Sequence, residues 1–403
     1  MSFVVLIQRY ARVIPFACVF LLFCALVWSQ QTLGSYAVVG RLLCFHPIPY
    51  LGDLHILLEG LDAIRAGLDP YQGVFNYPRA LELLLIFPFV KDANLVLLGI
   101  SIIVVFYFVL YILIGRITVR DAVVYSAMLC SPAVMLAVDR CNCDLIIMIF
   151  LATGLIFFRA RGVLAAAILA GAILKLFPIG ALACLVNAAA DKIKRGCIWL
   201  LAVGFGFSLY FLVSFPVMVS VSRKTPRPYD EASYGLWQVP SLLISRFEWL
   251  GHYKAMVFGL FVSCIVSLVI YVTRMGREPA PLVMEDRKGM AFLAGSGIFL
   301  TTCLIGYNWE YRLIFLILTV PQLLAWIDEG RAMVVWVLGL TLLVMFQSFF
   351  EAIVSVSTHG LYYHEIKFWY YVFGSKLLVV LLFVGHTRLF LGFARSVLVK
   401  LCR

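Results

Sequence analysis

Long apolar runs, separated by short polar connections, follow one another along the whole chain. The runs are continuous rather than alternating, which is typical of membrane helices and not of the strands of a membrane β-barrel. The pattern therefore predicts an all-α, polytopic membrane protein with about twelve membrane segments in a single domain over residues 1–403. The predicted segments are 13–28, 95–114, 122–138, 145–158, 163–174, 179–186, 198–219, 256–272, 290–305, 313–327, 334–353 and 368–384.

The composition excludes a soluble protein. The chain has 403 residues, of which 64% are hydrophobic and 13% charged. No polar segment is long enough for a separate soluble domain. Arg9 and Arg12 precede the first run as in a signal peptide. That run is long and no cleavage site follows it, so we expect an uncleaved first span.

The net charge of +11 comes from basic residues that lie between the apolar runs. This placement predicts orientation in an inner, or plasma, membrane and no nucleic-acid partner. With both termini in the cytoplasm, every inner loop is basic. The positive-inside rule, by which cytoplasmic loops carry the basic residues, holds here only if 163–174 and 179–186 enter the membrane and return, with Lys175 at the bend. The basic residues of the inner loops are Arg116, Arg120, Arg159, Arg161, Lys192, Lys194, Arg195, Arg274, Arg277, Arg287, Lys288 and Arg331.

The non-cytoplasmic face receives most of the acidic and aromatic residues. Residues 53–66 have leucines at helical spacing and predict an amphipathic helix in the outer interface. Residues 80–90 are apolar but too short to span, so we expect an interfacial or re-entrant segment. A carboxylate such as Asp53 is costly beside a bilayer, which makes it a functional candidate.

Motifs of several soluble enzyme classes are missing from the sequence. It contains no glycine-rich nucleotide loop, HExxH or GxSxG, which counts against ATP hydrolysis, metalloprotease and serine hydrolase chemistry. Cys141 and Cys143 have no second cysteine pair at metal-ligand spacing, so we predict no metal site there. The acids and bases of the outer connections suit a reaction on a lipid-borne substrate. Basic groups would hold a phosphate, and one carboxylate would take a proton.

Short polar motifs mark the outer connections in a fixed order. They are Gly52-Asp53 with Gly67-Leu68-Asp69-Pro70-Tyr71 and Tyr77-Pro78, then Asn142-Cys143-Asp144, Lys175-Leu176-Phe177-Pro178 and Asn308-Trp309-Glu310-Tyr311-Arg312. Over most of the chain this order resembles glycosyltransferase family 87, whose members have the GT-C fold and are typified by polyprenyl-phosphate-mannose-dependent α-mannosyltransferases. One departure is Arg79, where many relatives have a second proline. The residues that line the site next to Pro78, and the identity of the sugar, are therefore left open.

The resemblance implies an inverting hexosyltransferase, expected to be a mannosyltransferase, in a GT-C-like bundle. It would move the hexose from a polyprenyl-phosphate donor to a hydroxyl of a lipid or glycan acceptor at the non-cytoplasmic face. Asp53 is then the general base. The residues expected to bind the donor phosphate are Lys175, Arg312 and Arg140. The residues expected to contact substrate are Asp69, Tyr71, Tyr77, Asn142 and Glu310. No cofactor is implied, and the need for a divalent cation and the oligomeric state stay open.

Structural roles stay open for the same residues. Asp53 could cap its helix, Lys175 and Arg312 could extend to the membrane interface, and Asp69 fits a tight turn. Lys376, within an apolar run, is a further candidate ligand for the lipid phosphate.

Two other functions stay open as well. A transporter or flippase of lipid-linked sugars should have broken helices at matching positions of two halves. The sequence has one such bend, at Lys175, without a mate. An assembly subunit of an envelope complex would not depend on Asp53.

Overall fold

The computed structural model of the chain describes residues 8, 10–33, 51–72, 75, 77–186, 190–224, 233–275, 286–306, 308–357, 366 and 368–401. Arg9, Arg277 and the side chains of Lys192, Lys194 and Arg195 lie outside this description. The elements are α2 (Ile14–Leu33), α4 (Gly52–Arg65), η1 (Pro70–Gln72), η2 (Arg79–Ile86), η3 (Asp92–Asn94), α5 (Leu95–Ile114), α6 (Val119–Leu129), α7 (Pro132–Asp139), α8 (Cys143–Ile156), α9 (Arg161–Leu174), η4 (Phe177–Leu185), α10 (Ala190–Lys224), β1 (Ser233–Tyr234), α11 (Gln238–Arg246), η5 (Glu248–Tyr253), α12 (Lys254–Met275), α13 (Arg287–Ile305), β2 (Asn308–Trp309), η6 (Glu310–Thr319), α14 (Val320–Asp328), α15 (Ala332–Met345), α16 (Gln347–Ser357), η7 (Tyr370–Lys376) and α18 (Leu377–Leu401).

The chain is a helical membrane protein. Among the described residues, six helical segments are long and apolar enough to cross a membrane, or up to eight if each of two bent helix pairs is one span. The count of twelve stays a prediction. The short helices expected around Lys175 are present, because α9 ends at Leu174 and η4 begins at Phe177. The 14 residues of α9 extend about 21 Å at the usual rise, less than the roughly 30 Å of a hydrocarbon core.

Two runs predicted as single spans are bent. The run 122–138 divides into α6 and α7, which meet at 52°. Ser131 is extended there, and Pro132 occupies the first turn of α7, where its missing N–H costs no hydrogen bond. The run 334–353 divides in the same way into α15 and α16, at 57°. The hydropathy pattern does not predict either break, because the residues on both sides of each break are apolar.

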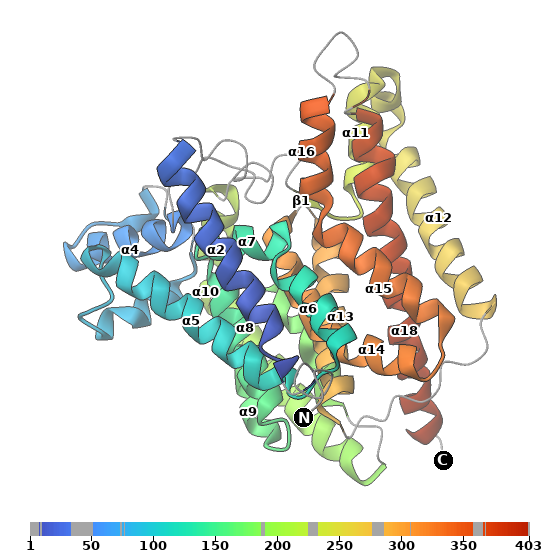
Figure 1. The fold of residues 1–403 in the computed structure, drawn as a ribbon, viewed down its shortest axis with the longest axis horizontal. Coiled ribbons are helices and arrows are strands. Elements are labelled where there is room, and N and C mark those ends of the chain that lie inside the picture. Colours follow the sequence, from blue (N-terminus) through green and yellow to red (C-terminus); the bar gives the residue numbers. More distant parts are fainter. Residues whose placement is uncertain are drawn as a thin grey trace.

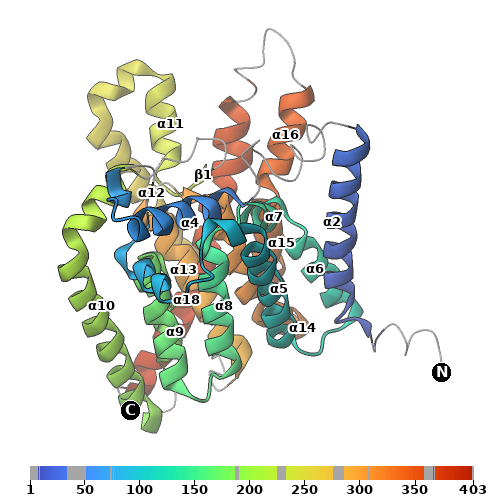
Figure 2. The ribbon, with the colours of Figure 1, turned by 90° about the vertical axis from the view of Figure 1, so that its left-hand side faces the viewer.

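The predicted amphipathic helix is α4. It buries one face, which includes Leu54, Leu57, Leu58 and Leu61, and it lies crosswise over the ends of α8 and α9 (Figure 2). The start of α2 and the end of α18 lie at the other end of the bundle (Figures 1 and 2). We call the end that carries α4 the α4 end. Its placement in the outer interface stays a prediction.

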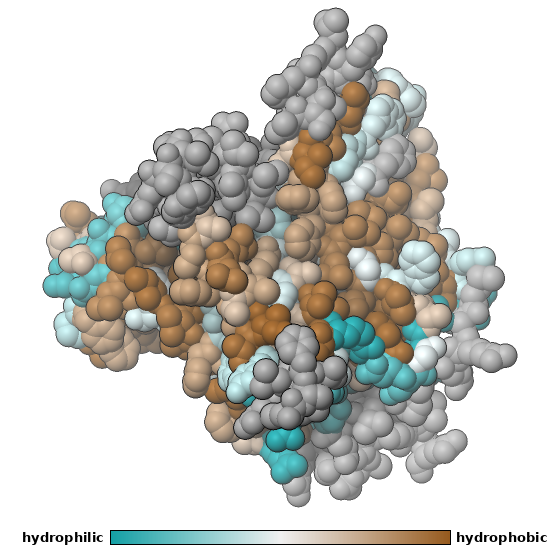
Figure 3. All heavy atoms as spheres, in the orientation of Figure 1, coloured by the Kyte–Doolittle hydropathy of each residue, from teal (hydrophilic) through white to brown (hydrophobic). Residues whose placement is uncertain are grey.

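The core gathers around α13 and around η6 with α14, whose most apolar stretches are 72% and 78% buried, whereas that of η5 with α12 has no buried residue. A Cβ on Gly180 of η4 would clash with the backbone of Gly297 in α13, so these two segments pack backbone to backbone. Hydrophobic side chains cover much of the visible flank (Figure 3), and hydrophilic ones gather near α4 and in the lower part of the view. Arg120, in the first turn of α6, pairs with Asp121 and with Asp328 at the end of α14.

Candidate active site

The start of α4 is fixed against the turn between α7 and α8. The backbone N–H of Leu51 donates to the carbonyl of Asp139 at 2.7 Å, and that of Asp53 donates to the carbonyl of Arg140 at 3.1 Å. From the other side, the Tyr77 hydroxyl donates to the Asp53 carbonyl at 2.8 Å. The backbone of Asp53 is therefore held from two directions.

Two residues beside this contact have left-handed backbones. Leu51 has φ 58° and Cys141 has φ 44°, and within the described ranges they are the non-glycine residues with positive φ. Such conformations cost about 1–3 kcal/mol each and concentrate at functional sites. The strain flanks the place where Asp53 meets Arg140.

The Asp53 carboxylate does not cap its helix. Arg140 donates to both of its oxygens, from Nη2 to Oδ1 at 2.5 Å and from Nε to Oδ2 at 2.9 Å. The side-chain amide of Asn142 also donates to Oδ2. The N-cap position falls on Leu51, which offers no side-chain cap. Asp53 is 6% exposed and faces the turn after α7.

The second carboxylate at this end is Asp144, in the first turn of α8. Lys175 reaches it from the extended residue after α9, with Nζ 2.6 Å from Oδ1. Arg312, from η6, has Nε 3.8 Å from Oδ2, and it also donates to the side chain of Asn308. Asn142 lies between the two carboxylates, because its side-chain oxygen accepts from Lys175 Nζ at 3.0 Å.

We call these six residues the charged cluster. Its members are Asp53, Arg140, Asn142, Asp144, Lys175 and Arg312.

Three basic side chains against two carboxylates leave the charged cluster with one net positive charge. The basic side chains keep some exposure, 13% for Arg140, 18% for Lys175 and 19% for Arg312, whereas Asp144 has none. Among the described atoms, Arg140 Nη1, Asp144 Oδ2 and Arg312 Nε are buried without a hydrogen-bond partner. The cluster therefore has unused donors and an excess of positive charge, which suits an anionic ligand.

Aromatic rings lie beside each cation. Arg140 is 5.6 Å from the Trp309 ring, Lys175 is 5.5 Å from Tyr311, and Arg312 is 5.0 Å from Phe177. Such rings favour cations and keep water away, which strengthens the electrostatics of the site.

The structure does not bring three of the expected substrate contacts into the charged cluster. Asp69 is exposed and accepts from the backbone N–H of Tyr71 at 2.9 Å, the turn that its sequence allows. Burial raises the pKa of the Tyr71 hydroxyl, which lies 3.4 Å from the carbonyl of Tyr77. Tyr77 itself is 6% exposed and lies beneath Asp53.

Glu310 belongs to a separate polar group, which we call the Glu310 cluster. Gln347 Nε2 donates to Glu310 Oε1 at 2.7 Å, and the Ser348 hydroxyl donates to Oε2. Ser375 donates to the side chain of Gln347 at 3.0 Å. Lys376, whose charge faces Glu310, donates to the carbonyl of Ser233 at 2.5 Å. The members are Glu310, Gln347, Ser348, Ser375 and Lys376, all at most 3% exposed.

The sequence names Asp144 in a motif of the outer connections but gives it no role, and the structure brings it to both Lys175 and Arg312. The signal was its place two residues after Asn142 in Asn142-Cys143-Asp144, the arrangement of a helix N-cap followed by a first-turn acid. Cys141, by contrast, stays a buried thiol, and burial raises its pKa to about 12.

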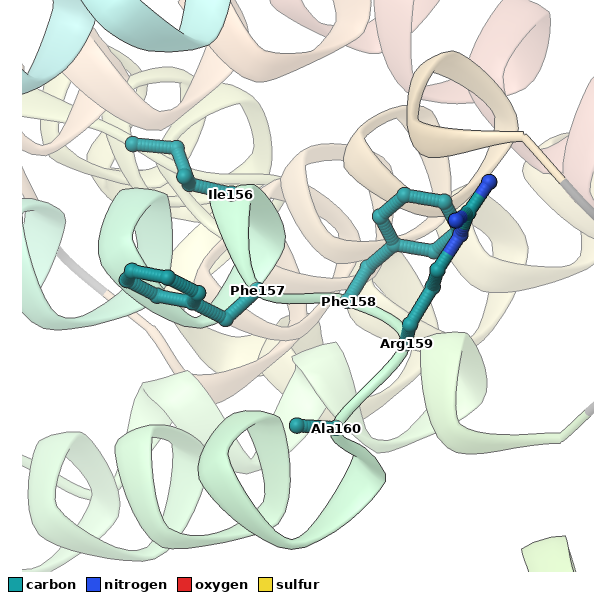
Figure 4. Close-up of a pocket in the computed structure, with 5 residues that line it drawn as sticks. All are labelled: Ile156, Phe157, Phe158, Arg159 and Ala160. Atoms are coloured by element: carbon teal, nitrogen blue, oxygen red, sulfur yellow. The ribbon is translucent and has the colours of Figure 1, made fainter.

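A hollow of about 360 Å³ lies at the far end of α8 from Asn142, in the turn before α9 (Figure 4). Its lining residues are Ile156, Phe157, Phe158, Arg159 and Ala160. It has one charged side chain and shares no residue with the charged cluster, so it does not bear on the candidate site. Comparison of the chain with protein-family models, curated proteins and solved structures gives no match.

Proposed function

We propose that this protein is a membrane glycosyltransferase that moves a hexose, mannose in the first instance, from a polyprenyl phosphate to an acceptor hydroxyl. The observation that carries the proposal is the charged cluster. Two carboxylates meet three basic side chains there: Asp53 pairs with Arg140, and Asp144 pairs with Lys175 and Arg312. The likeness of the motifs to glycosyltransferase family 87 supports the same assignment.

Charge explains why such a donor suits the cluster. A sugar joined to a polyprenyl phosphate carries one negative charge, and the phosphate monoester that leaves carries two. The net positive charge of the cluster therefore favours the leaving group over the bound donor. Fixed charges that match charge formed in the transition state are the usual largest contribution to catalysis.

Asp53 is the proposed base. A carboxylate has about four lone-pair positions; Oδ2 uses two of them on Arg140 and Asn142, and Oδ1 uses one on Arg140. Oδ1 thus keeps one position for the proton of the acceptor hydroxyl. The acceptor oxygen attacks the anomeric carbon with inversion, the carbon–oxygen bond to phosphate breaks, and its electron pair leaves with the polyprenyl phosphate.

Lys175 and Arg312 are the proposed phosphate ligands. Both are partly exposed at the α4 end and both approach Asp144, so their positions are fixed before the donor binds. The Lys175 ammonium bonds to Asn142 and Asp144 and also contacts the Cys143 thiol, so its position is fixed by several partners.

The test is transfer of radiolabelled mannose from polyprenyl-phosphate-mannose by purified protein in detergent with a lipid extract as acceptor. Native chain should form a labelled lipid or glycan product. Asp53→Asn should lower turnover by at least about 100-fold, the usual contribution of a general base, while the chain still binds donor.

The matched control is Asp328→Asn, since Asp328 is an exposed carboxylate that pairs with Arg120 away from the cluster. Its turnover should equal that of native chain. Equal turnover of Asp53→Asn would remove Asp53 as the base. Failure with every sugar in a panel of polyprenyl-phosphate donors would reject a transferase and favour transport of lipid-linked sugars.

A further inference from the structure

Asn142 is the residue through which the two halves of the charged cluster touch. Its side-chain nitrogen donates to Asp53 Oδ2, and its side-chain oxygen accepts from Lys175 Nζ at 3.0 Å. Within the described part of the chain, no hydrogen bond or ion pair joins Asp53 directly to Lys175 or Asp144.

The orientation of this amide is determined by its surroundings. The oxygen accepts from two donors, Lys175 Nζ and the backbone N–H of Asp144, each at 3.0 Å. Only an acceptor can occupy that position, so the NH₂ group must face Asp53. Asn142 is 3% exposed, which leaves little room for an incoming sugar to reach it. This argues against the direct substrate contact that the sequence suggested.

Resting on the proposed function, we propose that Asn142 is a positioning residue that couples the donor phosphate at Lys175 to the carboxylate of Asp53. A cation on the oxygen of an amide polarises it and makes its N–H a stronger donor, because hydrogen bonds in a chain reinforce one another. While Lys175 is free of phosphate, Asn142 holds Asp53 tightly. A phosphate beside Lys175 offsets that charge, weakens the donation to Asp53 and leaves the carboxylate a better proton acceptor. The base is thus strongest when the donor is bound.

A double-mutant cycle on ligand binding tests the coupling without turnover. The probe is farnesyl phosphate, a short polyprenyl phosphate, titrated against native chain, Asp53→Asn, Lys175→Ala and the double variant. Residues coupled through shared partners depart from additivity by about 0.5–3 kcal/mol, which is roughly 2- to 150-fold in affinity. The cycle is then repeated in an Asn142→Ser background. Serine retains the N-cap of α8 but has no amide to join the two halves, so the coupling should fall to within about 2-fold of additivity.

The matched control is Asp286→Ser, which exchanges the cap of α13, where Asp286 accepts from the backbone N–H of Gly289 at 2.8 Å. In that background the cycle should keep its native coupling. A second readout is the pH profile: the acid limb of kcat/KM should move to higher pH in Asn142→Ser, because a carboxylate that loses a hydrogen-bond donor holds its proton more readily. A residue that served folding alone would lower kcat and leave the limb in place.

The outcomes separate this inference from the proposed function. Persistent coupling in Asn142→Ser, with normal mannose transfer by native chain, would overturn the role of Asn142 and keep the transferase. Coupling that depends on Asn142 in a chain that transfers no sugar would keep the coupling and reject the transferase. A native chain that binds no farnesyl phosphate would overturn both.

Discussion

The charged cluster and the Glu310 cluster are two buried polar groups at the start of η6. They differ in how many of their buried polar atoms have hydrogen-bond partners. Each oxygen of Glu310 has a donor, and every member of its cluster is at most 3% exposed. The charged cluster has more charges, buried atoms without partners, and basic side chains that stay 13–19% exposed.

A closed polar group stabilises one packing of helices, whereas an open one with surplus charge is prepared for a ligand. The Glu310 cluster joins η6 to α16 and η7, and through Lys376 to β1, which pairs with β2 just before Arg312. We interpret the Glu310 cluster as the support that holds the Arg312 segment in place, and the charged cluster as the site.

Removal of a phosphate ligand should separate the two clusters most clearly. Lys175→Ala should weaken binding of farnesyl phosphate about 10- to 100-fold, since a charge-assisted hydrogen bond contributes about 1.5–3 kcal/mol. Because the change also leaves Asp144 without Lys175, the pair Lys175→Ala with Asp144→Asn should be measured beside it. Lys91→Ala is the matched control, because Lys91 is an exposed lysine near the start of α5. Unchanged affinity in Lys175→Ala would mean that Lys175 only pairs with Asp144 and does not bind the phosphate.

The Glu310 cluster should show the opposite response. Glu310→Ala leaves the donors of Gln347 and Ser348 without an acceptor, which costs about 1–3 kcal/mol. Thermal unfolding in detergent should therefore occur at a lower temperature, and affinity for farnesyl phosphate should fall far less than in Lys175→Ala. Glu310→Gln, which keeps an acceptor oxygen, should lose less. Lost affinity with native thermal stability would return Glu310 to the substrate contacts that the sequence favoured.

The sequence predicted the elements better than their contacts. Residues 95–114 form α5 with the predicted bounds. The long apolar run favours a helix, and Gly115, whose φ is 69°, ends it. Asp53 and Lys175 were identified because charges beside apolar runs are costly. Arg140 was identified as well, but its pairing with Asp53 was not, since the two residues are 87 positions apart and no local pattern fixes such a pairing.

Glu310 was expected in the same site as Arg312, and the local helix geometry explains why it lies elsewhere. It lies two residues before Arg312, and the shared motif placed both in one site. The segment η6 is a 3-10 helix, in which two residues are separated by roughly 240° around the axis. The two side chains therefore face different neighbours, α16 for Glu310 and α8 for Arg312.

The smallest predicted effect concerns the exposed side of α4, where ion pairs should matter far less than in either cluster. His55 Nδ1 lies 2.7 Å from Asp92 Oδ1 and Nε2 lies 3.2 Å from Glu59 Oε1. The hydrogen bond to Asp92 raises the pKa of His55 above its ordinary 6.5, against a smaller effect of burial. A raised folded-state pKa adds stability that is full below about pH 6.5 and is lost as the pH rises through the folded-state value. The His55 side chain is 37% exposed, so screening limits the effect to at most about 1 kcal/mol.

Hydrogen exchange of α4 amides should be slower at pH 6 than at pH 8, after correction for intrinsic rates, and His55→Gln should remove that difference. A pH difference that survives in His55→Gln would assign it to the carboxylates of α4 instead.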